Sequence, residues 1–361
     1  MPVGVIVFKL QNRPRMDKTV ICIAGGGVRC NFPLGCIIKF NEMNPEMMKA
    51  PHIVSGVSAG SLIAAGIATN TNLNNMYNDV SHAVLAPRIG PCGAMNKAVH
   101  LYTGSTAFLY SNAHLKKFID GRFVSKSVNH TLRVYAAKAS TLKQQMFQST
   151  IGTHTDTNAL LASCSIPGVF PSVNINNEAF IDGGAESNFP LYDIQQSLSN
   201  PAVKHLFVFA THPWDMRACR SRATALTSTK SILATLATNY MHAAAYVDDI
   251  HALNMLQLTE PPDGPFVARY CRENGNAKLL DVVTKTSEPT HMREFDMAAL
   301  CYAPTVKEYM ELNSESINLT TPWRKRLSVT DCMFNAGKQG AVSLNHVAIK
   351  AGVVTPPKLV L

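Results

Sequence analysis

Long apolar runs are missing from this sequence of 361 residues. No window holds about 18 uninterrupted apolar residues, the length that a helix needs to cross a bilayer. The apolar stretch Met1–Leu10 is short, and the charges of Arg13 and Arg15 follow it, whereas in a signal peptide the charges come first. We therefore expect this stretch to form an extra strand or arm, and we expect a cytoplasmic protein that meets membranes only at their surface.

Paired cysteines are missing as well. The nine cysteines are scattered, no C-x-x-C occurs, and no group of Cys and His has the spacing of zinc ligands. The sequence also has no acidic loop with the spacing of calcium ligands. We expect reduced thiols that pack as small hydrophobic groups, and we expect a protein with no metal and no cofactor.

Negative charge is scarce relative to positive charge. The chain has 33 Lys and Arg against 24 Asp and Glu, which gives a net charge of +9. Such an excess favours an anionic partner, either nucleic acid or an anionic membrane surface, although a solvated basic face is the plain alternative. The basic residues are dispersed, and the densest run, Arg324–Arg326, has no helix-turn-helix, RNP-like or zinc-finger signature around it. Nucleic-acid binding is therefore not expected.

Small and aliphatic residues are abundant, and they alternate between strand-like and helix-like patterns. Hydrophobic residues make up 46% of the chain, which is ample for a large core. The run Thr19–Ile23 predicts a strand, Leu34–Met43 an amphipathic helix, Pro51–Val54 a second strand and Leu62–Ala68 a second helix. This β-α-β-α order predicts an α/β fold with a mainly parallel central sheet flanked by helices.

The pattern weakens towards the C-terminus of the chain. Lys204–Thr211 predicts the last clear buried strand, and Ser231–Leu258 predicts a long helical stretch; after Pro261 the signals fade. We therefore predict one α/β domain over residues 17–215 and a mostly helical part over residues 216–361 that packs on it. The Pro- and Gly-broken segment Leu85–Ala98 is a candidate lid or membrane-facing element, and a plain surface loop is the alternative.

The most informative stretch is Gly56-Val57-Ser58-Ala59-Gly60, a G-x-S-x-G pentapeptide between a predicted strand and a predicted helix. In this context the pattern is typical of a nucleophile elbow, a sharp turn that lifts a serine hydroxyl clear of the sheet. Gly56 and Gly60 leave no Cβ where the strand and the helix crowd together. The pentapeptide alone is also compatible with an ordinary strand-to-helix loop.

Two further glycine turns follow predicted strands. Gly25-Gly26-Gly27 follows the first strand, and Asp182-Gly183-Gly184 follows a short strand at Phe180–Ile181. Turns at the carboxyl ends of parallel strands converge on one crevice, and a serine nucleophile needs both a base and an oxyanion hole there. Asp182 can be the base, and main-chain N–H groups of the first turn can form the hole. A dinucleotide fingerprint would need a third glycine where Cys30 stands, and a P-loop would need Gly-Lys-Ser/Thr.

An α/β-hydrolase is the nearest rival, because it uses the same elbow with Ser, Asp or Glu, and His in that order. Ser58 has little chain ahead of it for that fold. The downstream histidines also lack a convincing loop or motif: His242 and His251 lie in predicted helix, and His291 and His346 have no motif around them. The rival therefore requires a histidine that the sequence does not identify.

In these motifs the chain resembles the patatin-like phospholipases, which are acyl hydrolases with a Ser-Asp dyad. The resemblance rests on four blocks in the family's order: Gly25–Cys30, Gly56–Ser61, Ala162–Pro171, and Asp182–Gly184 with the trailing Asn188 and Pro190. They are similar to the family's glycine-rich oxyanion block, its G-x-S-x-G elbow, its A-S-x-x-[IV]-P-x-x-F-P segment and its D-G-G/A block. Two departures occur, since Ala24 stands where an aspartate is common and Cys30 replaces the oxyanion block's closing glycine.

The resemblance implies a role for each matched residue. Ser58 would be the nucleophile and Asp182 its proton acceptor. The motif glycines Gly56 and Gly60 would shape the turn at Ser58, and Gly183 and Gly184 the turn at Asp182. The oxyanion hole would be formed by the main chain of Gly25, Gly26, Gly27 and Val28. Arg29 would support the turn or meet a lipid phosphate, and a plain surface salt bridge is the alternative. The implied fold has three layers, with residues 17–215 as the catalytic domain. The implied substrates are phospholipids or lysophospholipids, and the implied mechanism needs no metal. A catalytically silent lipid-binding or interaction protein on the same fold is the alternative.

Overall fold

The computed structural model describes residues 18–48, 51–77, 111–214, 247, 250–260, 262–287, 294–313 and 323–355. The strands of this part of the chain are β1 (Lys18–Ile23), β2 (Pro51–Val57), β3 (Thr131–Lys138), β4 (Gln144–Ser149), β5 (Val173–Ile175), β6 (Glu178–Asp182), β7 (Val203–Phe209), β8 (Phe266–Glu273), β9 (Asn276–Val283) and β10 (Met297–Tyr302). The main helices are α1 (Asn31–Met43), α2 (Pro45–Met48), α3 (Ala59–Ala68), α6 (Ala113–Phe123), α7 (Thr157–Ser163), α8 (Leu191–Ser199), α10 (Val306–Asn313) and α11 (Trp323–Lys350), with 3-10 turns η1 (Gly27–Cys30) and η2 (Gly183–Ala185).

The described strands form one ten-stranded sheet in the order β5-β6-β3-β2-β1-β7-β10-β8-β9, with β4 paired to β3. Its centre is parallel, because β3, β2, β1, β7 and β10 pair in parallel with one another in turn. The remaining strands pair in antiparallel fashion at both sides. The predicted α/β fold with a mainly parallel central sheet flanked by helices is confirmed.

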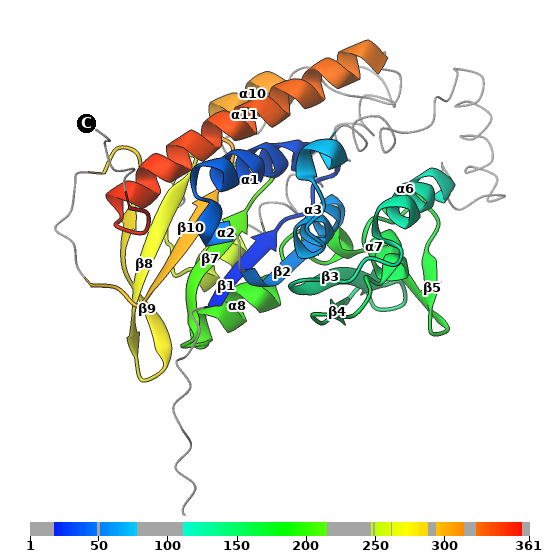
Figure 1. Ribbon diagram of the computed structural model, residues 1–361, viewed down its shortest axis with the longest axis horizontal. Coiled ribbons are helices and arrows are strands. Elements are labelled where there is room, and N and C mark those ends of the chain that lie inside the picture. Colours follow the sequence, from blue (N-terminus) through cyan, green and yellow to red (C-terminus); the bar gives the residue numbers. More distant parts are fainter. Residues whose placement is uncertain are drawn as a thin grey trace, which may run out of the picture.

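The sheet has helices on both faces, so the molecule has three layers (Figure 1). Strand β1 lies in the middle of the sheet and is buried on both faces. Ile21 and Ile23 enter the core on one face, with α1, α3 and α11, while Val20, Cys22 and Ala24 enter the core on the other face, with α8. A strand buried on both faces needs a continuous apolar run, and each fully buried Ile or Val side chain contributes about 1.5–3 kcal/mol relative to an exposed one.

The C-terminal part contributes strands as well as helices. Helices α10 and α11 occur where a helical part was predicted, but β8, β9 and β10 extend the sheet, and β10 pairs in parallel with β7. The sheet therefore continues across the boundary that we predicted near residue 215. All six residues of Met297–Tyr302 are buried. Such a short apolar run has no periodicity that separates a buried strand from a buried helix, which is why the sequence did not reveal it.

Helix α11 lies directly against α1 through two glycines. A Cβ on Gly35 would lie 2.1 Å from the carbonyl oxygen of Phe334, and a Cβ on Gly337 would lie 2.1 Å from that of Phe32. The two backbones therefore approach more closely than any side chain permits. This contact fixes α1, the helix that continues directly from η1 and the glycine turn before it.

Several predictions concern residues outside the described ranges: the arm at Met1–Leu10, the candidate lid Leu85–Ala98, and most of the helical stretch Ser231–Leu258. Within the described ranges, none of the helices combines the length and the apolar character that a membrane span requires.

Candidate active site

Ser58 stands at a sharp turn between β2 and α3, as the pentapeptide predicts. Its backbone has φ 52° and ψ −132°, a conformation that costs a non-glycine residue on the order of 1–3 kcal/mol. A Cβ on Gly56 would lie 2.4 Å from the Gly60 carbonyl oxygen, and a Cβ on Gly60 would lie 2.5 Å from that of Ala24. Both glycines are therefore required by close backbone contact, and together they hold the serine in its strained position.

The pairing of strand β3 explains how Asp182 reaches the serine. Strand β2 pairs with β3 as far as Val57, which is opposite Tyr135, and β6 then pairs with the next residues of β3, so that Asp182 is opposite Ala136. Because β4 occupies the other edge of β3 over the same residues, β6 and β2 share one edge. Strand β6 thus takes the place of β2 where β2 ends, and the two strands bring Ser58 and Asp182 together.

The two side chains form a short hydrogen bond in a buried environment. The Ser58 hydroxyl donates to Asp182 Oδ2 at 2.6 Å, and the Gly184 N–H donates to Asp182 Oδ1 at 2.8 Å. Only 6% of Ser58 and 5% of Asp182 is exposed. Burial raises the pKa of Asp182 from 3.8 to about 6, and the hydrogen bonds from Ser58 and Gly184 oppose that shift. The carboxylate is therefore a stronger base than an exposed aspartate, yet it is ionised at neutral pH.

Two further serines hold the elbow, and the sequence analysis assigned neither of them a role. Ser163 Oγ accepts the Ser58 N–H at 2.8 Å and donates to the Tyr135 carbonyl at 2.6 Å, while Ser61 Oγ donates to the Ser58 carbonyl at 2.6 Å. The bond between Ser58 and Ser163 joins residues that lie 105 positions apart in the chain. Such a contact leaves no local pattern, although Ser163 falls in one of the blocks that carry the resemblance.

The glycine turn lies directly against the serine, since a Cβ on Gly25 would be 3.1 Å from Ser58 Cβ. The Gly25 N–H donates to the Asn188 carbonyl at 2.8 Å, so Gly25 shapes the turn but cannot also donate to an oxyanion, contrary to our prediction. The N–H groups of Gly26, Gly27 and Val28 have no acceptor among the hydrogen bonds of the described residues, as expected at the start of a 3-10 helix. Those three groups are the available donors.

Arg29 and Cys30 complete the turn. The Arg29 guanidinium lies over the ring of Tyr309 on α10, 5.4 Å from its centroid, which ties the turn to the C-terminal part of the chain. The buried Cys30 thiol lies 3.6 Å from the Ala24 carbonyl oxygen, and burial raises its pKa far above the usual range. The thiol in place of the family's glycine is thus an inert packing group.

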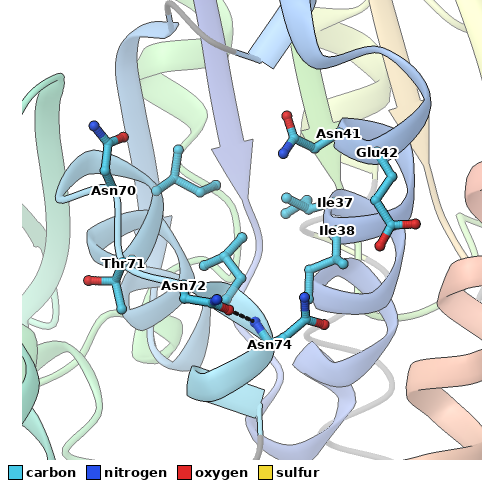
Figure 2. Close-up of a pocket in the computed structure, with 11 residues that line it drawn as sticks. Ile37, Ile38, Asn41, Glu42, Asn70, Thr71, Asn72 and Asn74 are labelled. Carbon is cyan, nitrogen blue, oxygen red and sulfur yellow. Dashed lines mark hydrogen bonds between the residues drawn. The ribbon is translucent and has the colours of Figure 1, made fainter.

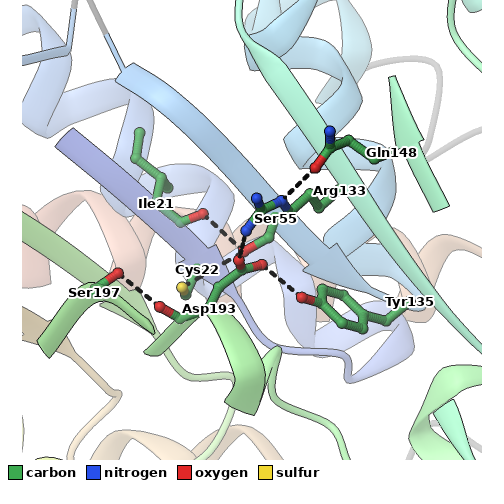
Figure 3. Close-up of polar contacts among 8 residues, drawn as sticks. All are labelled: Ile21, Cys22, Ser55, Arg133, Tyr135, Gln148, Asp193 and Ser197. Carbon is green, nitrogen blue, oxygen red and sulfur yellow. Dashed lines mark hydrogen bonds and ion pairs between the residues drawn. The ribbon is translucent and has the colours of Figure 1, made fainter. Parts of the chain in front are cut away.

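A second polar cluster joins Asp193, near the start of α8, to Arg133 and Tyr135 on β3 (Figure 3). The Asp193 carboxylate, of which 1% is exposed, accepts from Arg133 and, at 2.7 Å, from the Tyr135 hydroxyl. Arg133 also donates to Gln148 at 2.9 Å. Burial and the neighbouring Asp193 carboxylate raise the pKa of Tyr135. This cluster fixes the first turn of α8, three residues after the Asn188–Pro190 segment that contacts the glycine turn.

Two cavities lined by described residues lie away from the dyad. A cleft of about 340 Å³ lies between α1 and the segment after α3, with Asn41 and Glu42 on one side and Asn70–Asn72 on the other (Figure 2). A smaller cavity of about 120 Å³ adjoins Asp193. Neither Ser58 nor Asp182 lines either of them, so these cavities do not identify a substrate-binding pocket.

Residues 21–194 match the family model described as Patatin-like phospholipase. Among curated proteins, none matches the chain significantly. Among solved structures, the chain is similar to the crystal structure of VipD from Legionella pneumophila, with 13% sequence identity and a TM-score of 0.34 over 93% of this chain and 87% of that chain. A likeness of that size carries no argument about fold or function.

Proposed function

We propose, from the match of residues 21–194 to the patatin-like phospholipase family model, that the chain is a serine acyl hydrolase that cleaves fatty-acyl esters of phospholipids or lysophospholipids. The observation that carries the proposal is the 2.6 Å hydrogen bond from Ser58 Oγ to Asp182 Oδ2 at the end of two adjoining strands. A nucleophilic hydroxyl bonded to a buried base is the arrangement that covalent acyl transfer requires.

In the proposed reaction, Asp182 accepts the hydroxyl proton while Ser58 Oγ attacks the ester carbonyl carbon. The carbonyl oxygen becomes an oxyanion that the N–H groups of Gly26, Gly27 and Val28 stabilise. Collapse of the tetrahedral intermediate expels the lysolipid or glycerol alkoxide, which takes the proton from Asp182. Water then attacks the carbonyl carbon of the acyl-enzyme and gives a proton to Asp182. When this second tetrahedral intermediate collapses, Ser58 Oγ leaves and takes that proton from Asp182, which releases the fatty acid and restores both residues.

Asp182 alone cannot supply the whole rate enhancement, because a carboxylate is a weak base. Raising its pKa to about 6 brings it closer to the pH at which it works, which favours proton transfer. The remaining enhancement comes from the main-chain donors, each worth on the order of 10²–10³ in rate. The strained turn at Ser58 helps by holding the nucleophile in one position before the substrate binds.

The pH dependence of the reaction tests the base. Because Asp182 must be ionised to accept a proton, kcat/KM for a soluble ester is expected to rise with pH through an apparent pKa of about 6 and then reach a plateau. Below that pKa the value should fall about tenfold per pH unit, since only the ionised fraction reacts. A profile that stays flat across this range would mean that Asp182 is not the base.

The proposed partners are lipids. The net charge of +9 would favour peripheral contact with an anionic membrane surface, and nucleic acid stays outside the proposal because no recognition motif accompanies the charge. A salt-dependent affinity for vesicles that contain anionic lipid, with little affinity for neutral vesicles, is the expected behaviour.

The experiment that tests the function compares the wild type with Ser58→Ala. A fluorophosphonate probe is expected to label the wild type at one site and to leave Ser58→Ala unlabelled, and fatty-acid release from phospholipid should be lost in parallel. Ser199→Ala, which removes an exposed hydroxyl at the end of α8, serves as the matched control and should retain both.

Two other outcomes decide for the alternatives. A wild type that binds vesicles without taking the label would indicate a silent lipid-binding protein. If Asp182→Asn still takes the label and stays active, while a variant that replaces a histidine loses activity, the mechanism is that of an α/β-hydrolase.

A further inference from the structure

Both polar main-chain atoms of Gly25 are held by neighbouring elements. Its N–H donates to the carbonyl of Asn188 at 2.8 Å, and its own carbonyl accepts from Thr211 Oγ1 at 2.7 Å. Thr211 follows β7, the strand that pairs with β1 on the side away from β2, and none of it is exposed. The glycine turn is therefore held at both polar atoms of Gly25: the chain after β6 accepts from its N–H, and the chain after β7 donates to its C=O.

The bond from Thr211 fixes more than the carbonyl that it contacts. The Gly25–Gly26 peptide is trans, so the Gly26 N–H points opposite to the Gly25 C=O within one rigid plane. Because the carbonyl is directed at Thr211, the Gly26 N–H is directed away from Thr211. The hydroxyl of Thr211 thus sets the direction of the first of the three available donors.

Thr211 also packs directly against Gly26. A Cβ on Gly26 would lie 2.4 Å from Thr211 Oγ1 and 2.7 Å from Thr211 Cβ, so the threonine occupies the space that a side chain would need. The Thr211 hydroxyl donates its proton to the Gly25 carbonyl, and His212 Nδ1 lies 3.4 Å from Thr211 Oγ1. The threonine side chain is therefore held in one orientation by packing and by both polar contacts.

We propose that Thr211 is a positioning residue of the acyl-transfer reaction, one that orients the Gly26 N–H towards the developing oxyanion through the Gly25–Gly26 peptide. The proposal rests on the proposed function, and it adds a residue outside the four blocks that carry the resemblance. Thr211 does not contact Asp182 or Ser58 in any hydrogen bond of the described residues, so its effect should be confined to stabilisation of the oxyanion.

The test compares Thr211→Val, which keeps the shape and removes the hydroxyl, with Thr211→Ser, which keeps the hydroxyl. In Thr211→Val we expect kcat on a soluble ester to fall about 10- to 100-fold with KM changed by less than about threefold. The inhibition constant of a trifluoromethyl ketone, whose serine adduct carries an oxyanion, should rise by a similar factor. Thr211→Ser should restore both to within about threefold, and the apparent pKa of the pH profile should not move.

Thr69→Val is the matched control, because it removes another buried hydroxyl that donates to a carbonyl at 2.7 Å, at the far end of α3. It should lower the melting temperature without changing kcat. If Thr211→Val is poorly folded, the comparison of Thr211→Ser with Thr211→Cys, which has a weak donor, carries the same test. Wild-type kcat and ketone affinity in Thr211→Val, or a loss that Thr211→Ser fails to restore, would overturn the proposal. Activity in Ser58→Ala would instead overturn the proposed function itself.

Discussion

Replacing Asp182 by Asn is expected to lower fatty-acid release by about 10³-fold or more while the protein stays folded. An amide has nearly the same shape as the carboxylate, and its oxygen can still accept the Gly184 N–H. It cannot accept the proton of Ser58, however, because its other group is itself a donor. The measurement is kcat/KM on a soluble ester, together with the rate of fluorophosphonate labelling, and both should fall. Residual activity within about tenfold of the wild type would exclude Asp182 as the base.

The same substitution is expected to make the protein more stable at neutral pH. The folded-state pKa of Asp182 is about 6, above the unfolded value of 3.8, because burial penalises the charge. Its contribution to stability is therefore fully present below about pH 4 and is lost as the pH rises through 6. Asn carries no charge to penalise, so the free energy of unfolding at about pH 7.5 should rise by about 2–3 kcal/mol, and the gain should vanish near pH 4.

Urea denaturation of both proteins at the two pH values measures this effect. A variant that is less stable than the wild type at neutral pH would show that the bonds from Ser58 and Gly184 outweigh burial in the folded protein. A variant that is both inactive and more stable would show that the site retains a costly buried carboxylate for the reaction, a trade of stability for activity that is common at active sites.

Local sequence was sufficient to predict the elbow and the sheet around it. Gly56 and Gly60 are fixed by contacts within a few residues of the serine or against the first strand, so the pentapeptide predicts the turn wherever a strand and a helix flank it. The position of Asp182 after a strand, combined with the resemblance, predicted its side chain near Ser58, and the 2.6 Å bond agrees with that expectation.

Contacts between distant segments could not be predicted in the same way. Thr211 and Ser163 hold main-chain atoms of Gly25 and Ser58 across separations of 186 and 105 residues. A lone hydroxyl in a sequence carries no signal of which carbonyl or N–H it will meet. The prediction for Gly25 was wrong for a related reason: a triglycine shows that main-chain groups are accessible, but the acceptor that takes the first N–H comes from Asn188 in another turn.

Removing the arginine from the polar cluster that joins α8 to β3 is expected to destabilise the protein strongly. In Arg133→Met, the Asp193 carboxyl group would lose its cationic partner with only 1% of its side chain exposed, and among the described residues the Tyr135 hydroxyl would be the side-chain partner left to it. Breaking a buried pair in this way costs about 3–5 kcal/mol, because an uncompensated charge remains. Lys138→Met, which breaks the exposed pair with Glu178, is the matched control and should cost less than about 1 kcal/mol.

Chemical denaturation of the variants measures these losses, and a further variant separates charge from packing. If the cost arises from the orphaned carboxylate, the combined change Arg133→Met, Tyr135→Phe and Asp193→Leu should recover most of it, since the buried polar side chains are then gone and the exposed Gln148 can bond to water. If the combined variant is as unstable as Arg133→Met, shape rather than charge holds α8 in place.

A loss of less than about 1 kcal/mol in Arg133→Met would contradict the burial of the pair. The cluster also bears on the reaction, because α8 begins at Leu191, immediately after the segment whose Asn188 carbonyl accepts from Gly25. A loosened α8 should therefore lower kcat in Arg133→Met even under conditions where the protein is fully folded, and the combined variant should regain it.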